Sequence, residues 1–121
     1  MRRIIASPIA LLIVLAAAGA EAHAFLDRAE PRVGSSVAAA PRQVSLWFTQ
    51  NLEPAFSTVE VQDSAGARVD QGGPRVDPAH PSVMRIAVKP LSPGTYKVHW
   101  RVLSVDTHTT EGSFSFRVGS P

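Results

Sequence analysis

The sequence contains no cysteine, and this absence excludes several kinds of stabilisation and chemistry. Small exported domains often depend on disulfide bonds, so here a packed apolar core has to supply the stability instead. Cysteine zinc sites, iron–sulfur clusters and thiol redox reactions are excluded for the same reason. Any metal site must therefore use nitrogen, oxygen or thioether ligands.

The motifs of several enzyme classes and of nucleic-acid-binding proteins are also missing. No glycine-rich phosphate loop precedes a helical segment, no serine lies in a nucleophile elbow, and no carboxylate pair stands out as a glycosidase dyad. The formal net charge is +2, and the basic residues form no clustered face of the kind that binds nucleic acid. The composition thus favours neither a hydrolase nor a partner of DNA or RNA.

The first 22 residues resemble a secretory signal peptide. Two arginines open the chain, Ile9 to Ala18 is an uninterrupted apolar run, and Ala20-Glu21-Ala22 has the small-x-small pattern of a cleavage site. The run is too short for a spanning helix, and no later run is long enough either. We therefore predict export to the periplasm and a mature form that is not embedded in the membrane.

The position of cleavage decides the first residue of the mature chain. Cleavage after Ala22 is preferred because the apolar run ends close to it. It would leave residues 23–121, beginning at His23. Cleavage after Ala24 is the alternative, because Ala22-His23-Ala24 is also small-x-small, and it would remove the histidine.

The rest of the sequence alternates apolar and polar residues in short segments bounded by proline, glycine and serine. This pattern, without long helical periodicity, predicts one all-β domain of about seven strands, an antiparallel sandwich or Greek-key barrel. The glycines and prolines of residues 70–82 predict an irregular surface excursion. The expected strands lie at 24–28, 43–49, 58–63, 84–88, 96–102 and 112–118.

Two ends of this chain carry residues that could share one metal ion. Asp106 and His108 are two residues apart and would lie on the same side of an extended backbone. A mature N-terminal His23 would offer its α-amine and its imidazole to one ion. Three nitrogens and one oxygen suit a single Cu(II) ion, whereas zinc prefers a tetrahedral set. Because the amine must lose a proton, binding should weaken as the pH falls.

Some of these assignments have alternatives. Asp106 could accept a hydrogen bond from the ring of a ligating histidine and so orient it, instead of binding the metal directly. His80 lies in a proline-rich loop and could be a secondary ligand or a surface residue. His99 alternates with two basic residues, so we expect it to be a solvated surface histidine.

The sequence from His23 onward resembles the CopC-type periplasmic copper-binding proteins, and the resemblance covers essentially the whole mature chain. The most specific part is Pro-Gly-Thr-Tyr-x-Val-x-Trp-Arg followed by Ser-x-Asp-x-His. The matching segments are His23, Ala29-Glu30-Pro31-Arg32-Val33-Gly34-Ser35, Val44-Ser45-Leu46-Trp47-Phe48-Thr49-Gln50-Asn51-Leu52, Leu91 to Val102, and Ser104-Val105-Asp106-Thr107-His108.

The resemblance implies an Ig-like, cupredoxin-like β-sandwich that binds one Cu(II) ion and catalyses no reaction. The family's ligands fall on His23, Asp106 and His108. The implied role is copper resistance, homeostasis or delivery by a monomer, with a CopD-type inner-membrane protein as partner. The methionine-rich loop of some members is missing, and Met84 is the one methionine after the signal, so no separate Cu(I) site is expected.

Two other functions fit parts of the sequence. Lytic polysaccharide monooxygenases also hold copper with an N-terminal histidine brace, so a small copper-dependent oxidative enzyme is one alternative. The short mature chain leaves little room for an extended substrate surface. A metal-free Ig-like interaction module is the other alternative, and it predicts no effect of Cu(II) on thermal stability.

Overall fold

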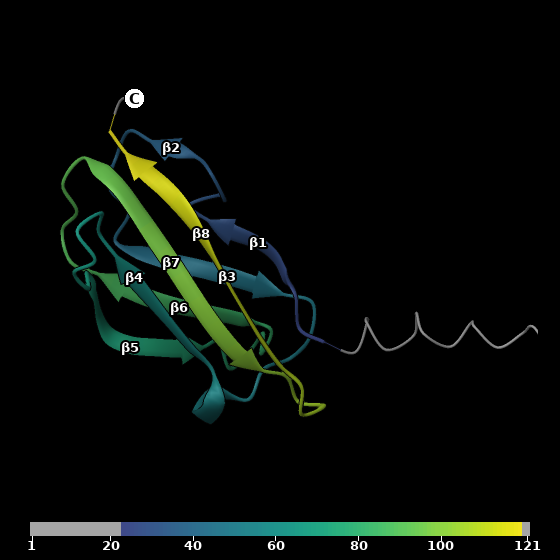
Figure 1. The fold of residues 1–121 in the computed structure, drawn as a ribbon. Coiled ribbons are helices and arrows are strands. Elements are labelled where there is room, and N and C mark those ends of the chain that lie inside the picture. The colour runs from purple at the N-terminus through teal and green to yellow at the C-terminus, as the bar shows by residue number, and fades with distance from the viewer. Residues whose placement is uncertain (1–22, 120–121) are drawn as a thin grey trace, which may run out of the picture.

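Eight strands form two four-stranded sheets that pack face to face (Figure 1). The computed structural model describes residues 23–119, so the predicted signal peptide and its cleavage site lie outside the described residues. The elements are β1 (Leu26–Glu30), β2 (Ser36–Val37), β3 (Gln43–Phe48), the 3-10 helix η2 (Pro54–Phe56), β4 (Thr58–Gln62), β5 (Asp70–Val76), β6 (Val83–Val88), β7 (Gly94–Leu103) and β8 (Thr109–Val118).

The strand order confirms the predicted β-sandwich. One sheet has the order β1-β3-β6-β5 and the other β2-β8-β7-β4, so the chain changes sheet at every connection from β1 to β5 and again between β6 and β7. Crossings of this kind are typical of Greek-key sandwiches. One detail of the prediction was wrong, because β2 pairs with β8 in parallel, so the strands are not all antiparallel.

Strand β7 shows how the alternating pattern produces the core. Tyr96, Val98, Trp100 and Val102 point inward and are at most 6% exposed. Trp100 meets Phe48 of the opposite sheet edge-to-face, with ring centroids 5.1 Å apart. Burial of large side chains from both sheets supplies the stability that disulfides cannot.

Residues 70–76 form a strand, so the predicted irregular excursion over residues 70–82 was wrong in its first half. Strand β5 pairs with β6, but the register shifts between Gln71 and Arg75. Gly72 and Gly73 both have positive φ angles at this shift, which glycine adopts without steric cost. The glycines therefore form a bulge within an edge strand, where proline is also tolerated.

The first strand begins two residues later than predicted, at Leu26. Trp47 of β3 pairs with Arg28 of this strand. The Arg28 guanidinium lies 3.9 Å from the centroid of the indole ring. This cation–π contact covers the aromatic ring on an otherwise polar face.

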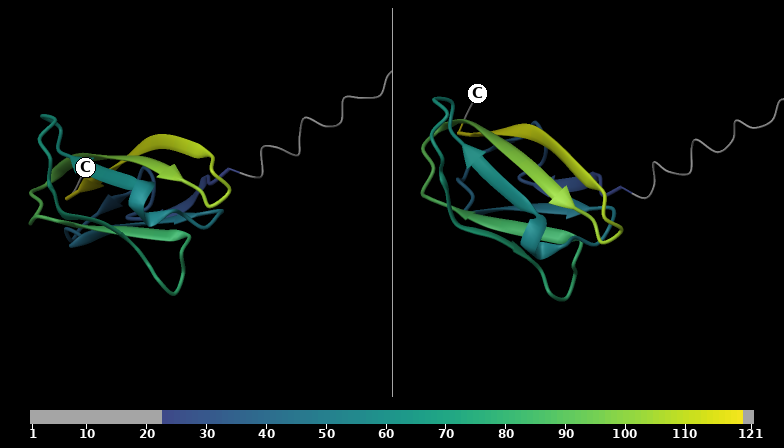
Figure 2. Two further views of the ribbon diagram at one scale, coloured as in Figure 1. Left: turned by 90° about the horizontal axis from the view of Figure 1, so that it is seen from below. Right: turned by 60° about the horizontal axis from the view of Figure 1, so that its bottom comes forward.

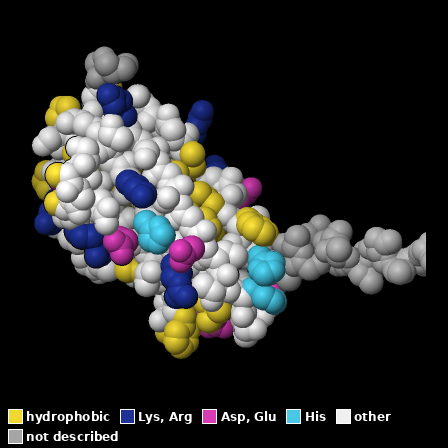
Figure 3. Space-filling view, in the orientation of Figure 1, with side chains coloured by type: hydrophobic (Ala, Val, Ile, Leu, Met, Phe, Trp, Pro, Cys, Tyr) yellow, Lys and Arg dark blue, Asp and Glu magenta, His cyan; other side chains and the backbone are white. Residues whose placement is uncertain are grey.

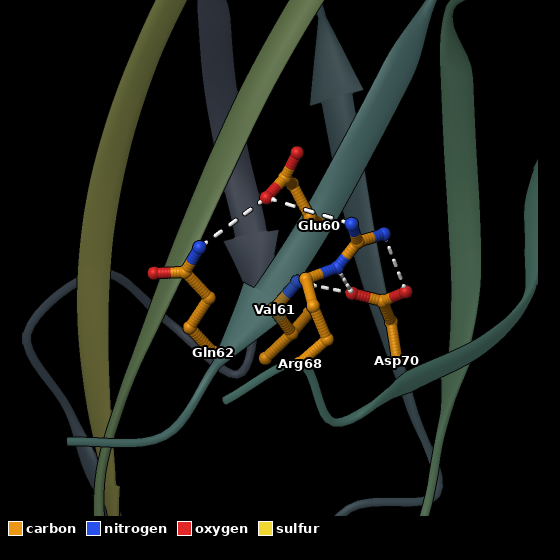
Figure 4. A network of polar contacts seen from close by, with 5 residues as sticks. All are labelled: Glu60, Val61, Gln62, Arg68 and Asp70. Atoms are coloured by element: carbon orange, nitrogen blue, oxygen red, sulfur yellow. Dashed lines mark hydrogen bonds and ion pairs between the residues drawn. The ribbon is translucent and has the colours of Figure 1, made fainter. Parts of the chain in front are cut away.

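The edge strands of the two sheets are joined by a network of charged side chains (Figure 4). Asp70 of β5 accepts a hydrogen bond from the Val61 N–H of β4 at 2.7 Å and two from the Arg68 guanidinium at 2.9 Å each. Arg68 also lies 3.8 Å from Glu60. The Asp70 carboxylate thereby occupies a backbone donor of β4 that an edge strand would otherwise expose.

Candidate metal centre

The loop between β7 and β8 is a tight turn that holds Asp106 and His108. The Ser104 N–H donates to the His108 carbonyl at 3.0 Å, and the Thr107 N–H donates to the Ser104 carbonyl at 2.8 Å. Thr107 has a φ of 72°, in the left-handed region that threonine rarely adopts. Asp106 and His108 therefore lie in a loop between two strands, and a turn, not an extended backbone, brings their side chains together.

The Asp106 carboxylate faces the ring of His108. Oδ1 of Asp106 lies 3.4 Å from Nδ1 of His108, and the same oxygen accepts a hydrogen bond from the Ser104 hydroxyl. That hydrogen bond is the main cause that holds the pKa of Asp106 below its ordinary value; desolvation opposes it, and the His108 side chain adds to the lowering. Asp106 is thus a carboxylate at neutral pH, and the far ring nitrogen of His108, Nε2, faces away from it.

His23 is held in place by contacts of the residues that follow it. Thr49 donates its hydroxyl hydrogen to the His23 carbonyl at 3.3 Å and accepts the Phe25 N–H at 2.9 Å. Ala24 is fully buried, and its carbonyl accepts a hydrogen bond from the Thr110 hydroxyl at 2.6 Å. Thr110 belongs to β8, so these contacts tie the start of the described chain to the strand that follows His108.

These two anchors bring His23 and His108 together. Their ring centroids are 4.4 Å apart, with a tilt of 53° between the planes. Figure 2 shows the start of the chain beside the β7–β8 loop, and Figure 3 shows two neighbouring histidines at that end. A metal–imidazole bond is about 2.0–2.1 Å long, so two rings at this separation can reach one ion.

The side chains alone do not complete a metal site. Within residues 23–119 no group of three or more His, Cys, Asp or Glu side chains is arranged to hold a metal ion. A main-chain nitrogen can act as a further donor beside these side chains. In the full chain the nitrogen of His23 is a peptide nitrogen, and it would become an amine if the bond after Ala22 were cut. The donors present fit copper, because imidazole nitrogen and carboxylate oxygen are ligands that Cu(II) accepts.

The other two described histidines lie apart from this pair. His99 is on β7, opposite Glu60 and Ser113 in the neighbouring strands, and is half-buried on the outer face. His80 is 74% exposed, with its Nδ1 3.9 Å from Asp77. Neither contacts His23 or His108 in the structure, so the geometry favours no role for them in the same site.

A groove of about 530 Å³ lies elsewhere, between η2 and the segment that joins β5 to β6. Its one carboxylate, Asp77, is engaged by Arg85 at 2.9 Å. The groove is therefore a poor metal site. Its lining residues are Pro54, Ser57, Pro74, Arg75, Val76, Asp77, Pro78, Met84 and Arg85.

Sequence reasoning picked out His23, Asp106 and His108, and in the structure His108 lies beside each of the other two. It missed the residues that position them, which are Ser104, Thr49 and Thr110. Ser104 is fully buried although polar, and its place in the Ser-x-Asp-x-His segment was the available signal. Thr49 and Thr110 gave none, because a hydroxyl that holds a distant carbonyl has no local pattern.

Comparison with known proteins gives consistent matches over the described chain. The model of the CopC domain matches residues 26–119. Copper resistance protein C of Xanthomonas campestris pv. juglandis is 37% identical over 112 residues, which cover 86% of each chain. The crystal structure of CopC from Methylosinus trichosporium OB3b superposes with a TM-score of 0.75 at 38% identity, covering 79% of this chain and 93% of that one.

A third relative is much longer than this chain. The copper transport protein CutJ of Bacillus subtilis is 29% identical over 99 residues, which cover 81% of this chain but 18% of CutJ. In that protein, a segment similar to this one is joined to a far larger remainder. Within residues 23–119 of the present chain, no helix is long and apolar enough to cross a membrane.

Proposed function

The chain belongs to the CopC family of copper resistance proteins, and from this membership we propose that it binds one Cu(II) ion between its two ends. The observation that carries the proposal is the pair of His23 and His108, with ring centroids 4.4 Å apart. The proposed ligands are the α-amine and imidazole of His23 and the imidazole of His108, with Asp106 beside them. We also propose that the protein is exported to the periplasm as a monomer.

The proposed ligand set has a chemical reason. Cu(II) has the highest affinity among the divalent first-row ions for nitrogen and oxygen ligands, and it favours a square arrangement. The amine and the ring of one N-terminal histidine can close a chelate on a single ion. The described residues contain no cysteine and Met84 is fully buried in the core, which supports Cu(II) over Cu(I) as the proposed ion.

For Asp106 we propose first a positioning role. Its Oδ1 lies 3.4 Å from Nδ1 of His108, and a ligating histidine commonly donates its second ring N–H to a carboxylate. This contact fixes the ring so that Nε2 is the nitrogen left for copper. Direct ligation by a carboxylate oxygen of Asp106 is compatible with the same arrangement, and the predictions below separate the two roles.

The proposed role is copper resistance or delivery, with a membrane protein of the CopD type as partner. CutJ supports this proposal, because it is a copper transport protein in which a similar segment is part of one long chain. A separate small protein could supply the same segment to a membrane partner as a second chain. The site does not need an extended substrate surface for such a role.

One experiment tests the metal site. The mature N-terminus is determined by mass spectrometry of the exported protein, and Cu(II) is then titrated into wild type, His108→Ala and the control His99→Ala. We expect a chain that begins at His23, Cu(II) binding with a stoichiometry of one, and a loss of affinity of at least about 100-fold in His108→Ala alone. Each 1.4 kcal/mol of lost binding free energy is tenfold in affinity. A mature chain that begins at Phe25, or equal binding in His108→Ala, contradicts the proposal.

The two alternatives give different results in the same preparation. A small oxidative enzyme predicts turnover of an oligosaccharide by the copper-loaded protein with ascorbate and oxygen. A metal-free interaction module predicts that Cu(II) leaves the melting temperature unchanged, whereas a ligand of the native state must raise it. We expect a raised melting temperature and no turnover.

A further inference from the structure

The groove of about 530 Å³ beside η2, which we name the η2 groove, has the size and lining of a small-molecule site. Such sites typically enclose about 300–1,000 Å³ and combine apolar walls with a few polar groups that orient the ligand. Five of the nine lining residues are apolar, namely three prolines, Val76 and Met84. His23, Asp106 and His108 are not among the nine, so an inference about this groove does not rest on the proposed copper site.

The η2 groove opens where the edge strands of the two sheets separate. Strands β4 and β5 are edge strands, and at one end the hydrogen bond between Asp70 and the Val61 N–H joins them. At the other end Ser57, which precedes β4, and Val76, which ends β5, both line the groove. Figure 1 shows η2 and the end of β5 in the same part of the molecule. The opening therefore gives access to the space between the sheets.

The free edge of β5 argues against an added peptide strand as the occupant. The Asp77 N–H donates to the Val83 carbonyl of β6 at 2.9 Å, and successive residues of a strand direct their amides to opposite sides. Pro74, Val76 and Pro78 therefore face the free edge. Two of these three have no N–H to donate, which protects an edge from pairing. A small molecule fits the groove better than a strand does.

The charges at the groove favour an anion. Arg75 of β5 and Arg85 of β6 lie directly opposite each other, and like charges at such positions repel. Arg85 donates a hydrogen bond to Asp77 at 2.9 Å, and this bond is the main cause that holds the pKa of Asp77 below its ordinary value. Asp77 thus neutralises Arg85. Within residues 23–119 Arg75 forms no ion pair, so the lining carries one positive charge in excess.

The apolar part of the lining favours a flat ring. Pro54 belongs to η2, Pro74 to β5, and Pro78 follows β5, so prolines line the groove from both sheets. Proline rings pack well on aromatic rings, as when proline-rich segments dock in grooves lined by aromatic residues. Val76 and the fully buried Met84 are the lining residues that face the core. An aromatic ring between these groups would leave water for apolar surroundings.

We propose that the η2 groove binds a small aromatic carboxylate, with its ring among the prolines and its carboxylate on Arg75. A guanidinium and a carboxylate can form two parallel hydrogen bonds, which adds geometric specificity to the charge attraction. The Ser57 hydroxyl is already engaged, because the Leu103 N–H donates to it at 3.2 Å. Arg75 is therefore the group that selects the charge of the ligand.

Binding of hydrocinnamate, a phenyl ring on a propionate chain, tests the proposal. The protein is produced with methyl-labelled methionine and titrated in the absence of copper, so failure of the copper site would not affect the result. Met84 is the only methionine of residues 23–121, and its methyl signal reports a ring bound at the η2 groove. We expect a saturable shift of this signal. Hydrocinnamyl alcohol, which has the ring without the charge, and acetate, which has the charge without the ring, should bind at least about tenfold more weakly, or by about 1.4 kcal/mol.

A pair of variants assigns the charge preference to one residue. Arg75→Gln should weaken binding of hydrocinnamate roughly tenfold and leave that of the alcohol unchanged. Lys97→Gln removes the same charge from an exposed position of β7 and should bind as wild type does. The comparison of acid and alcohol in wild type needs no variant, so it stands even if Arg75→Gln folds poorly.

Several results would overturn the proposal. One is the absence of a Met84 shift at millimolar hydrocinnamate, and another is an equal affinity of wild type for the acid and the alcohol. Equal affinities of folded Arg75→Gln and wild type for the acid would also contradict it. A wild-type dimer that hydrocinnamate dissociates would assign the groove to a second copy of this chain instead.

Discussion

At the scale of single residues, Ser104 determines the shape of the loop between β7 and β8. It is fully buried, its hydroxyl donates to Asp106, and the same oxygen lies 3.2 Å from the His108 carbonyl. A buried polar group of this kind is costly unless it is bonded. The residue therefore connects both ends of the turn that carries the proposed ligands.

Ser104→Ala should weaken Cu(II) binding although the residue cannot touch the ion. Loss of the hydroxyl frees the Asp106 carboxylate and, through it, the ring of His108. Removing an outer partner of a metal ligand typically costs about 10–100-fold in affinity. Isothermal titration of Cu(II) measures the change, and Ser113→Ala, an exposed serine on β8, is the control.

Asp106→Asn separates the two roles of the carboxylate. The amide can still accept a hydrogen bond from His108 but no longer carries a charge. If Asp106 positions the ring, we expect the variant to lose about 10–100-fold in Cu(II) affinity with an unchanged electron paramagnetic resonance spectrum. A changed spectrum would instead assign one of the equatorial ligands to Asp106.

The sequence picked out the candidate site residues but did not predict their contact. A histidine at the predicted mature N-terminus and an Asp-x-His pair are recognisable because their side chains are common metal ligands. Their meeting depends on Thr49 and Thr110, which hold backbone carbonyls of His23 and Ala24 from distant strands. No local pattern encodes such a contact, so the 4.4 Å separation of the rings could come only from the folded structure.

At the scale of elements, the β7–β8 hairpin places the loop. Its two strands pair over ten residues each, from Gly94 opposite Val118 to Leu103 opposite Thr109. Trp100 of β7 lies over Gly112 of β8, and a Cβ at Gly112 would lie 2.6 Å from Cζ2 of the indole. The glycine is thus required by a close approach of side chain to backbone and not by a turn.

Gly112→Ala should destabilise the protein. The added methyl group forces Trp100 out of its contact with Phe48 or shifts β8, and overpacking of this kind costs about 1–3 kcal/mol. Urea denaturation monitored by tryptophan fluorescence measures the loss. Ser113→Ala changes the adjacent exposed residue and should stay within about 0.5 kcal/mol of wild type.

The network between β4 and β5 predicts a pH dependence of stability. Burial alone would raise the pKa of Asp70, but hydrogen bonds from Arg68 and the Val61 N–H, with the charge of Arg68, hold it below its ordinary value. A carboxyl with a lowered folded pKa stabilises the native state above its unfolded pKa, about 3.9. This contribution is lost as the pH falls through the folded pKa.

Asp70→Asn should therefore lower the free energy of unfolding at pH 7, by about 1.5–3 kcal/mol for a hydrogen bond to a charged group. The difference from wild type should shrink at an acidic pH below the folded pKa of Asp70, where the group is protonated in both states. Urea denaturation at both pH values measures it, with Asp27→Asn on β1 as the exposed control. A difference that is the same at both pH values would contradict the assignment.

Strand prediction succeeded where alternation was clean and failed at β5. The inward residues of β7 follow from period two alone, because each faces the core directly. In β5 the two glycines and Pro74 have the composition of a loop, yet a bulge at Gly72 and Gly73 lets the strand continue. Pairing with β6 supplies the partner that the local sequence does not indicate.

At the scale of the whole molecule, the proposed site depends on a cut peptide bond. A mature chain that starts at His23 should gain about 2.7 kcal/mol of stability from Cu(II) at 100 times its dissociation constant. A chain that starts at Ala22 keeps both imidazoles and Asp106 but replaces the amine with an amide. We expect a much smaller Cu(II)-induced rise of its melting temperature in differential scanning calorimetry. Equal rises in the two chains would remove the amine from the proposed ligands.

Fold class followed from the sequence as a whole, because about seven short alternating segments without helical periodicity permit few architectures. The assignment of strands to two sheets, and the parallel contact of β2 with β8, did not follow. These depend on which edges meet after the sheets stack, which is a property of the assembled core.

The length of β8 separates the histidine pair from the C-terminal end of the described chain. The strand starts at Thr109, next to His108, and runs for ten residues, or about 33 Å, to the opposite end (Figure 1). A sensor surface, a reporter or a neighbouring domain could therefore be attached after Gly119 without contacting the histidine pair. The end that carries His23 and His108 would remain accessible to molecules in solution.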